Sequence, residues 1–220
     1  DYNGVSEEAD WDSILHSQVK KLLSDFLCPD CIAGLKTVES PLCSCCGLPF
    51  ESRQGVDHRC GECCTSPKHF RIARAPLVFE QVFTEVIHCF KYKGKIQLAR
   101  PLAELLLMAF GYFWDKDSID LVVPVPLHFK RLRKRGFNQA HLLIRNWKAV
   151  RGQVPFDVGD LQIVDNVLVR RVPTAPQTGL GRKQRAANIK DAFGLLDAAK
   201  INDKRILLVD DVYTTGATVD

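Results

Sequence analysis

Apolar residues recur along the chain at spacings that predict alternating helices and strands. The first helical face is formed by Leu15, Val19, Leu22, Leu23 and Phe26. A second face runs through residues 79–90, after a short predicted strand at residues 75–79, and a broadly apolar, buried helix is expected over residues 98–113. Further strands are expected at residues 119–126, where prolines confine the end, and at residues 206–209, which fit a strand buried on both faces. This alternation predicts an α/β fold with an open, mainly parallel sheet.

Two adjacent carboxylates and a small polar loop follow the last predicted strand. The acid pair is Asp210 and Asp211, and the phosphate loop that begins the next predicted helix is Thr214, Thr215, Gly216, Ala217 and Thr218. Backbone N–H groups and hydroxyls at a helix N-terminus converge on one spot, with the positive end of the helix dipole behind them. Such a loop therefore suits a phosphate. It lacks the lysine and glycine spacing of a P-loop and the G-x-G-x-x-G pattern of dinucleotide folds.

The acid pair adds a second kind of recognition. Ionised Asp accepts hydrogen bonds from two hydroxyls and also binds hard cations, so the acid pair suits vicinal hydroxyls with a divalent metal nearby. Together with the phosphate loop it predicts a site for a ribose 5-phosphate. The alternative is that the acid pair merely ends a strand before an ordinary turn.

A basic stretch without any Asp or Glu covers residues 130–151, directly after the predicted strand at residues 119–126. Its first part, with Arg131 and Arg135, is expected to form a loop before a helix that Asn138 caps. Ligands of open α/β sheets bind at the carboxyl ends of strands, and this loop has the charge to hold pyrophosphate. We therefore expect the basic loop and the phosphate loop at the ends of neighbouring strands.

The basic residues also fit a nucleic acid. Phe137 and Trp147 lie among them and would offer aromatic faces to the bases of single-stranded DNA. The plainer alternatives are a solvated helix face and two core aromatics. A second stretch without acids, residues 170–190, contains Arg182 and Arg185. This distribution, more than the modest net charge of +4, implies an anionic partner.

Six of the nine cysteines form C-x-x-C pairs, which are Cys28 with Cys31, Cys43 with Cys46, and Cys60 with Cys63. A C-x-x-C turn lets two thiolates reach one metal, and two such pairs complete a four-cysteine zinc site. The short polar stretch between the second and third pairs is typical of a zinc ribbon, so we expect the metal there first. Cys28 and Cys31 could share that cluster, use His16 or His58, or have lost a fourth pair upstream. Disulfides and a thioredoxin-like redox role fit the pattern less well.

Several of these segments resemble known families. The segment from Val209 to Thr218 resembles the phosphoribosyl pyrophosphate motif of type I phosphoribosyltransferases. Residues 123–127 with residues 135–139, a block within residues 177–193 and the C-x-x-C ribbon are similar to the ComF family, the competence-associated phosphoribosyltransferase-like proteins of bacteria. The resemblance covers residues 28–220.

The resemblance implies roles for the candidate residues: the ribose hydroxyls for Asp210 and Asp211, the 5-phosphate for residues 214–218, and the pyrophosphate with magnesium for residues 131–135. Arg182 and Arg185 would close over the leaving group as a lid, or else belong to a solvated helix start. A nucleophile would displace pyrophosphate from C1 of the ribose, and no residue identifies the acceptor. The alternative function is a ligand-sensing or single-stranded-DNA-binding module in competence and DNA uptake, acting with other DNA-uptake proteins.

Composition and domain boundaries complete the expectations. The chain has 220 residues, 46% hydrophobic and 25% charged, as in soluble globular proteins. No signal peptide is recognisable at its start, and we expect a cytoplasmic protein without an apolar run of the roughly 18 residues that cross a bilayer. We expect three parts: an N-terminal helical segment in residues 1–27, a cysteine-rich zinc ribbon in residues 28–70, and a phosphoribosyltransferase-like domain in residues 71–220, truncated at its C-terminus.

Overall fold

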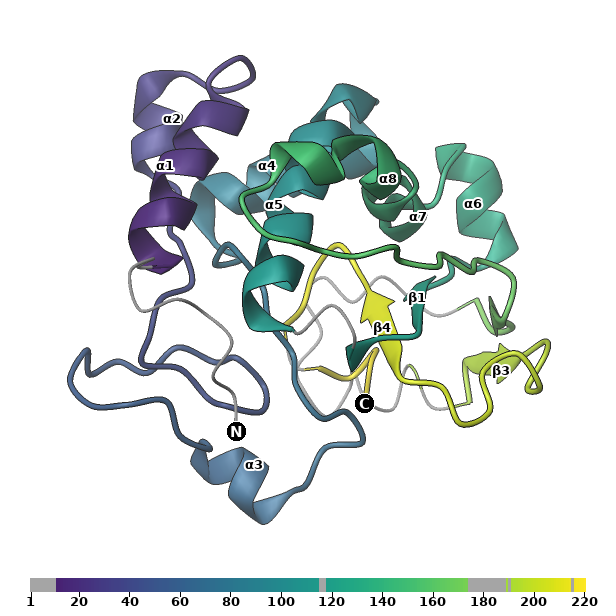
Figure 1. The fold of residues 1–220 in the computed structure, drawn as a ribbon. Helices are drawn as coiled ribbons and strands as arrows, with labels where there is room; N and C mark the ends of the chain where they lie inside the picture. The colour runs from purple at the N-terminus through teal and green to yellow at the C-terminus, as the bar shows by residue number, and fades with distance from the viewer. Residues whose placement is uncertain (1–10, 115–117, 174–188, 190, 215) are drawn as a thin grey trace.

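A computed structural model of the 220-residue chain describes all residues except 1–10, 115–117, 174–188, 190 and 215 (Figure 1). The α-helices are α1 (Trp11–Leu23), α2 (Pro29–Ala33), α3 (Gly61–Thr65), α4 (Gln81–Tyr92), α5 (Ala99–Phe113), α6 (Phe129–Arg135), α7 (Gln139–Ile144) and α8 (Trp147–Val150). The short 3-10 helices are η1 (Ile96–Leu98) and η3 (Arg151–Gln153). The strands are β1 (Leu121–Pro124), β2 (Leu168–Arg170), β3 (Phe193–Leu195) and β4 (Ile206–Val209).

Two of these strands form a small parallel sheet at the centre of the molecule. β1 pairs with β4 in a register that sets Leu121 opposite Ile206 and Pro124 opposite Val209. The Val125 N–H also donates to the Val209 carbonyl at 2.9 Å, so the pairing continues past the end of β1. The expectation of parallel pairing is confirmed for these two strands. Their carboxyl ends therefore lie side by side, and the residues that follow both strands emerge at one edge.

Other segments extend this centre only slightly. Ile163 makes an isolated parallel bridge with Val122, on β1, while β2 and β3 form a separate antiparallel pair. The short strand expected at residues 75–79 is absent, and this segment contributes only an antiparallel bridge between Leu77 and Thr37. Pro76 has no N–H to donate, which prevents a longer ladder there.

Helix α5 is the centre of the hydrophobic core. One of its faces, which includes Leu107 and Phe110, packs with Val122 of β1 and with Trp147. The opposite face, through Leu105 and Met108, packs with Leu15 and Val19 of α1, so the predicted N-terminal helix is present and docked on α5. Figure 1 shows α4 to α8 above the β1–β4 pair and α3 below it.

The apolar character of α5 and the residues before it corrects the expectation that no apolar run is long enough to cross a bilayer. The segment Ile96–Phe113 has 18 residues and a mean hydropathy of 1.2, which is enough by length and composition to cross a membrane. More than half of the segment, 56%, is buried inside the protein. Burial on two faces accounts for the missing polar stripe, because a helix that contacts protein on both sides needs apolar residues on both sides.

Candidate functional site

The thiols of Cys43, Cys46, Cys60 and Cys63 form a buried cluster in which all four sulfur atoms lie within 4.8 Å of one another. The backbone N–H groups of Cys46 and Cys60 donate to Cys43 Sγ at 3.4 and 3.3 Å. Gly47 completes the turn with a φ of +69°, and a Cβ there would lie 2.5 Å from the Ala73 carbonyl oxygen, so only glycine fits. The second and third C-x-x-C pairs thus converge on one point, as their spacing predicted.

Electrostatics in this cysteine cluster favour a bound cation. Burial alone would raise the pKa of Cys43, but the N–H donors from Cys60 and Cys46 outweigh it and lower the pKa to about 6. Burial raises the pKa of Cys46 to about 11 and raises that of Cys63 as well. One thiolate is therefore stable there, while further ionisation requires a positive charge. Four converging thiols with this behaviour can hold a structural metal such as zinc, which binds four cysteines tetrahedrally.

The remaining C-x-x-C pair lies apart from the cysteine cluster. Cys28 is exposed and Cys31 is half-buried, at the start of α2. Within the described residues, no other His, Cys, Asp or Glu joins these two thiols in a group of three ligand atoms. The ring of His58 stacks on Phe50 at 4.1 Å, and its Nδ1 lies 2.9 Å from the Val56 carbonyl. A metal-binding role for Cys28 and Cys31 remains a prediction, and the structure does not bring them to the cluster.

The acid pair lies at the carboxyl end of β4 and has a partner that the sequence did not indicate. Lys91 Nζ, from the last turn of α4, lies 2.9 Å from Asp211 Oδ1, and both side chains are largely buried. The Asp211 N–H donates to Asp210 Oδ1 at 2.8 Å. Burial and the neighbouring charge of Asp211 raise the pKa of Asp210 to about 8. The pair therefore combines an ion-paired carboxylate with one that is readily protonated.

The basic residues after β1 form helix α6 instead of the expected loop. His128 caps its start by accepting from the Lys130 N–H at 3.3 Å, and Gly136 ends it with a φ of +85°. Asn138 caps α7 as predicted, accepting from the Ala140 N–H at 3.1 Å. Each of these two consecutive helices therefore begins with a side-chain cap, and only residues 136–138 lie between them.

Arg131 and Arg135, at opposite ends of one helical turn, lie in different environments. Arg135 donates to Gln139 Oε1 and stacks over the Tyr92 ring, with its Cζ 4.8 Å from the ring centroid. The charge of Arg131 acts on a second arginine, Arg170, whose pKa is lowered first by burial and then by that charge. As residues four positions apart, Arg131 and Arg135 lie on the same side of α6, and Arg135 already contacts Gln139 and Tyr92.

Arg170 is, after Lys91, a second residue near the acid pair that the sequence analysis did not single out. It ends β2, is only 6% exposed, and has its Cζ 5.2 Å from the Phe193 ring centroid. The carboxylate of Asp210 acts on it electrostatically in the opposite direction to Arg131. The available signal was an arginine at the end of an apolar triplet that opens the second basic stretch, an unusual position for a buried residue.

The phosphate loop follows the acid pair after Val212 and Tyr213. Gly216 has a φ of +76°, and the backbone N–H groups of Val219 and Asp220 both donate to its carbonyl at 2.9 Å. These bonds form a single turn of the kind that begins a helix. Thr214 is exposed, while Ala217 and Thr218 are half-buried. Thr215 lies outside the described residues, as do Arg182 and Arg185, the predicted lid.

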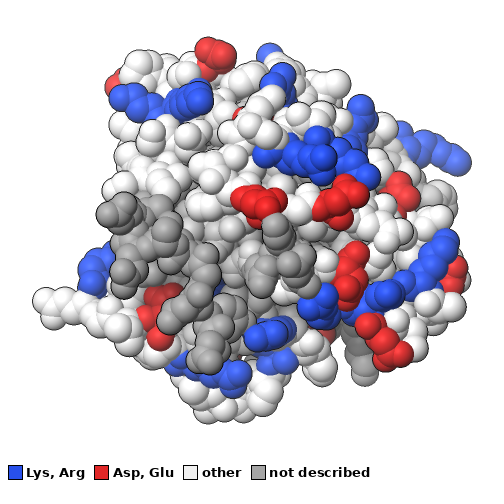
Figure 2. All heavy atoms as spheres, in the orientation of Figure 1, with Lys and Arg blue, Asp and Glu red and all other residues white. Residues whose placement is uncertain are grey.

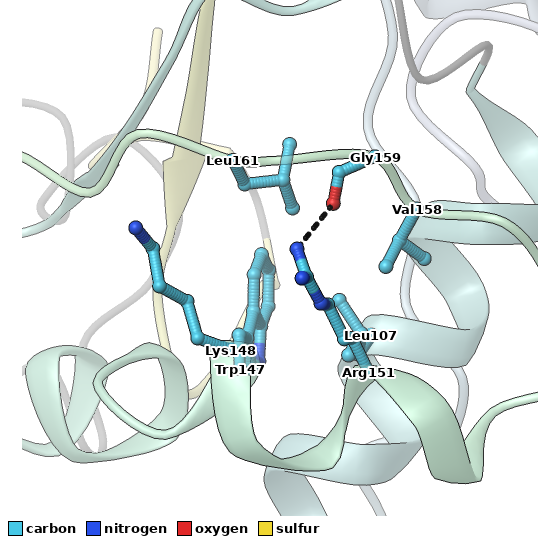
Figure 3. A pocket seen from close by; sticks show the side chains of 7 residues that line it. All are labelled: Leu107, Trp147, Lys148, Arg151, Val158, Gly159 and Leu161. Carbon is cyan, nitrogen blue, oxygen red and sulfur yellow. Dashed lines mark hydrogen bonds between the residues drawn. The ribbon is translucent and has the colours of Figure 1, made fainter.

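Two hollows lie near these elements. The cavity in Figure 3 is lined by Leu107, Trp147, Lys148, Arg151, Val158, Gly159 and Leu161. Its volume of about 10 Å³ holds about one water, and Arg151 donates to the Gly159 carbonyl inside it. A larger hollow of about 360 Å³ opens at the carboxyl end of β1, between α6 and α7. Only the larger one has the size of a ligand site.

The surface charge of the basic stretch divides into two parts. Figure 2 shows Lys and Arg side chains over α6 and α8, with acidic side chains next to those of α8. Lys148 and Arg151 form ion pairs with Asp160 at 3.7 and 3.5 Å. The aromatic residues considered for DNA stacking are not available, because Trp147 is 2% exposed and Phe137 packs on Phe90. Trp147 is a core residue, since α8 turns its apolar face to α5, while half-buried Phe137 packs at the edge of the core and lines the larger hollow.

Comparison with known proteins identifies relatives over most of the chain. No model of a protein family matches the chain, and no solved structure matches it. Competence protein F of Haemophilus influenzae is 29% identical over 215 residues, which cover 89% of this chain and 88% of that protein. DNA utilization protein YhgH of Escherichia coli K12 is 28% identical over 199 residues, covering 88% and 80%. Competence protein ComFC of Bacillus subtilis is 25% identical over 206 residues, covering 88% and 74%. These relatives, at 25–29% identity over most of the chain, support its resemblance to the ComF family.

Proposed function

We propose that the edge formed by the carboxyl ends of β1 and β4 binds phosphoribosyl pyrophosphate with magnesium. The observation that carries this proposal is the parallel register of the two strands, which sets Pro124 beside Val209. Because of that register, the acid pair and the cationic helix α6 emerge at the same edge. The fold would then be that of a type I phosphoribosyltransferase, with its ligand outside the carboxyl ends of the strands.

Each group of the ligand has a chemically suitable partner at this edge. The acid pair would accept hydrogen bonds from the vicinal hydroxyls of the ribose, as ionised carboxylates do. The phosphate loop, residues 214–218, would donate backbone N–H groups to the 5-phosphate. Arg131 and Arg170 would face the pyrophosphate, with Arg135 nearby and Arg182 and Arg185 as the lid. Magnesium bound to the diphosphate favours ionised Asp210, since a nearby cation lowers the pKa of a carboxyl.

Phosphoribosyl transfer is the reaction that such a site would support. A nitrogen nucleophile of the acceptor forms a bond to C1 of the ribose, and the C1–O bond breaks with its electron pair leaving on pyrophosphate. Arg131 and Arg170 would stabilise the charge that develops on the leaving group. The chain supplies positioning and charge in this step, and no covalent nucleophile of the protein takes part.

Calorimetric titration with phosphoribosyl pyrophosphate and magnesium tests this proposal. Replacing both Asp210→Asn and Asp211→Asn removes two charged acceptors, each worth about 1.5–3 kcal/mol, so binding should weaken at least about 100-fold. Asp160→Asn, in an ion pair away from this edge, is the matched control. Affinity unchanged in the double variant would refute the proposed site. Pyrophosphate release with candidate bases then separates an enzyme from a protein that only binds.

A second candidate function is the binding of single-stranded DNA by a non-catalytic module. Helix α6 exposes Phe129 (58%) and Leu132 (42%) beside Arg133 and Lys134, which gives apolar and cationic surface together. The names of the relatives concern competence and DNA utilization, which supports a place in DNA uptake. We propose that the module acts in the cytoplasm with other DNA-uptake proteins. Exposed Phe129 would stack on bases in the way that Phe137 and Trp147 cannot.

A further inference from the structure

The cysteine cluster packs directly against the phosphate loop through one aromatic ring. Tyr213, which lies between the acid pair and the phosphate loop, packs with Phe50 and Phe70 against a buried group of five cysteines, the four of the cysteine cluster and Cys45. The ring centroids of Phe70 and Tyr213 are 6.3 Å apart at an interplanar angle of 84°. A Cβ on Gly216 would lie 3.1 Å from the Tyr213 hydroxyl oxygen, so this ring fills the space between Gly216 and the cluster.

A second contact joins the end of the same turn to the ribbon. Asp220 Oδ1 accepts from the His69 backbone N–H at 2.8 Å, and Asp220 Oδ2 lies 3.3 Å from Lys68 Nζ. Lys68 has a side chain only 7% exposed and also pairs with Glu62 of α3 at 2.8 Å. The Asp220 N–H closes the turn by donating to the Gly216 carbonyl. Asp220 therefore links the backbone of the phosphate loop to Lys68 and His69, in the segment that follows Cys63 and α3.

We propose that the metal-bound cysteine cluster holds the phosphate loop in its binding conformation, with Tyr213 and Asp220 as the positioning residues. The part that concerns ligand affinity rests on the proposed function above. The backbone N–H groups of Val219 and Asp220 close the single turn after β4 on one carbonyl, that of Gly216. An isolated turn is marginally stable by itself, because few hydrogen bonds offset the entropy of ordering it. A loop that binds through backbone N–H groups therefore needs external support to keep those groups aligned.

The metal is the part of this support that can be removed. Without a cation, four buried thiols at this spacing have no common partner, and a ribbon of this size keeps its fold chiefly through the metal. Loss of the metal would free α3 and the segment with Lys68 and Phe70, and so both contacts with the turn. Whether the cysteine cluster holds its metal would then determine the ligand affinity of the phosphate loop, although no metal-binding cysteine belongs to that loop.

Hydrogen exchange on the full chain tests this inference without reference to any ligand. Removing zinc from the loaded protein with a chelator should speed exchange in peptides covering residues 209–220 about tenfold or more, while α5 and β1 keep their protection. Unchanged exchange in residues 209–220 after the metal has left would overturn the inference. If the chelator loosens the whole chain, the zinc-loaded variant Asp220→Ala provides the test instead. The inference predicts faster hydrogen exchange near Gly216 in this variant, and unchanged exchange there would overturn it.

Ligand titration separates this inference from the proposed function. Zinc-loaded Asp220→Ala and Tyr213→Leu should bind phosphoribosyl pyrophosphate about tenfold more weakly than the unaltered protein, and Asp160→Ala should bind it equally well. Equal affinity in all four would overturn the positioning role while the proposed function stands. No binding by the unaltered protein, combined with metal-dependent exchange in residues 209–220, would refute the proposed function and leave the structural coupling in place.

Discussion

Lys91 and Asp211 are joined by an ion pair of 2.9 Å, although 120 positions of sequence separate them. The pair connects the C-terminal turn of α4 to the acid pair after β4. Only 19% of the lysine side chain and 10% of the aspartate side chain are exposed. Water therefore compensates poorly for the loss of either partner, and the contact fixes the direction of the Asp211 carboxylate.

Substituting Lys91→Met should leave Asp211 with a buried, unpaired charge. Breaking a buried pair from one side costs about 3–5 kcal/mol, and the residual exposure here places the expected loss of unfolding free energy at about 2–3 kcal/mol. Urea denaturation at pH 8 measures it, with Lys91→Arg as the variant that keeps the charge. Equal stability of Lys91→Met and the unaltered protein would show that the pair contributes nothing.

The acid pair also predicts a pH dependence of stability. The folded-state pKa of Asp210 is raised to about 8, whereas the unfolded value is about 3.9. Between these values the folded chain retains a proton that the unfolded chain has lost, so stability falls as pH rises from about 4 to about 8. This one group contributes at most about 1.4 kcal/mol per pH unit.

Asp210→Asn should flatten that part of the profile, because the variant has no proton to retain. The measurement is the urea midpoint of both proteins at intervals across this range. Parallel profiles would mean that Asp210 titrates near its ordinary pKa in the folded protein.

Local patterns predicted the features that depend on neighbouring residues. Ile206–Val209 is an apolar run ended by charge, so its strand and the position of Asp210 could be recognised directly. The cysteine cluster could be predicted from the spacing of its four residues, Cys43, Cys46, Cys60 and Cys63. Each C-x-x-C turn brings two sulfur atoms together, independently of the rest of the fold.

Contacts between distant segments could not be predicted in this way. Nothing in the sequence around Lys91 or Arg170 indicates that either interacts with the acid pair. Lys91 contacts Asp211 because of where α4 packs, and the charge of Asp210 acts on Arg170 because of where β2 lies. The same reason explains why the sequence left two alternatives open for Trp147, of which the structure supports the core position. A tryptophan among cations looks exposed in the sequence, but α5 supplies an apolar surface that buries it.

Metal content distinguishes the two groups of cysteines. Cys60→Ser should abolish tight zinc binding, because three thiols leave a structural tetrahedral site incomplete. Cys28→Ser with Cys31→Ser should keep about one zinc per chain, if these thiols lie apart from the metal as they do here. Elemental analysis of the purified proteins gives the ratio. Loss of zinc in the Cys28/Cys31 variant would instead indicate that these two cysteines are needed for metal binding.

Salt dependence tests the second candidate function on α6. If Arg133 and Lys134 bind the phosphates of single-stranded DNA, replacing both with Glu should weaken binding and reduce the slope of log affinity against log salt by about 0.7 for each phosphate that is no longer neutralised. Lys148→Glu is the matched control, since Lys148 already pairs with Asp160 and should contribute little. Fluorescence anisotropy with a labelled oligonucleotide at several salt concentrations measures both quantities. Equal effects of the α6 and α8 changes would indicate non-specific attraction by net charge, and binding insensitive to salt would exclude α6 as a phosphate-binding surface.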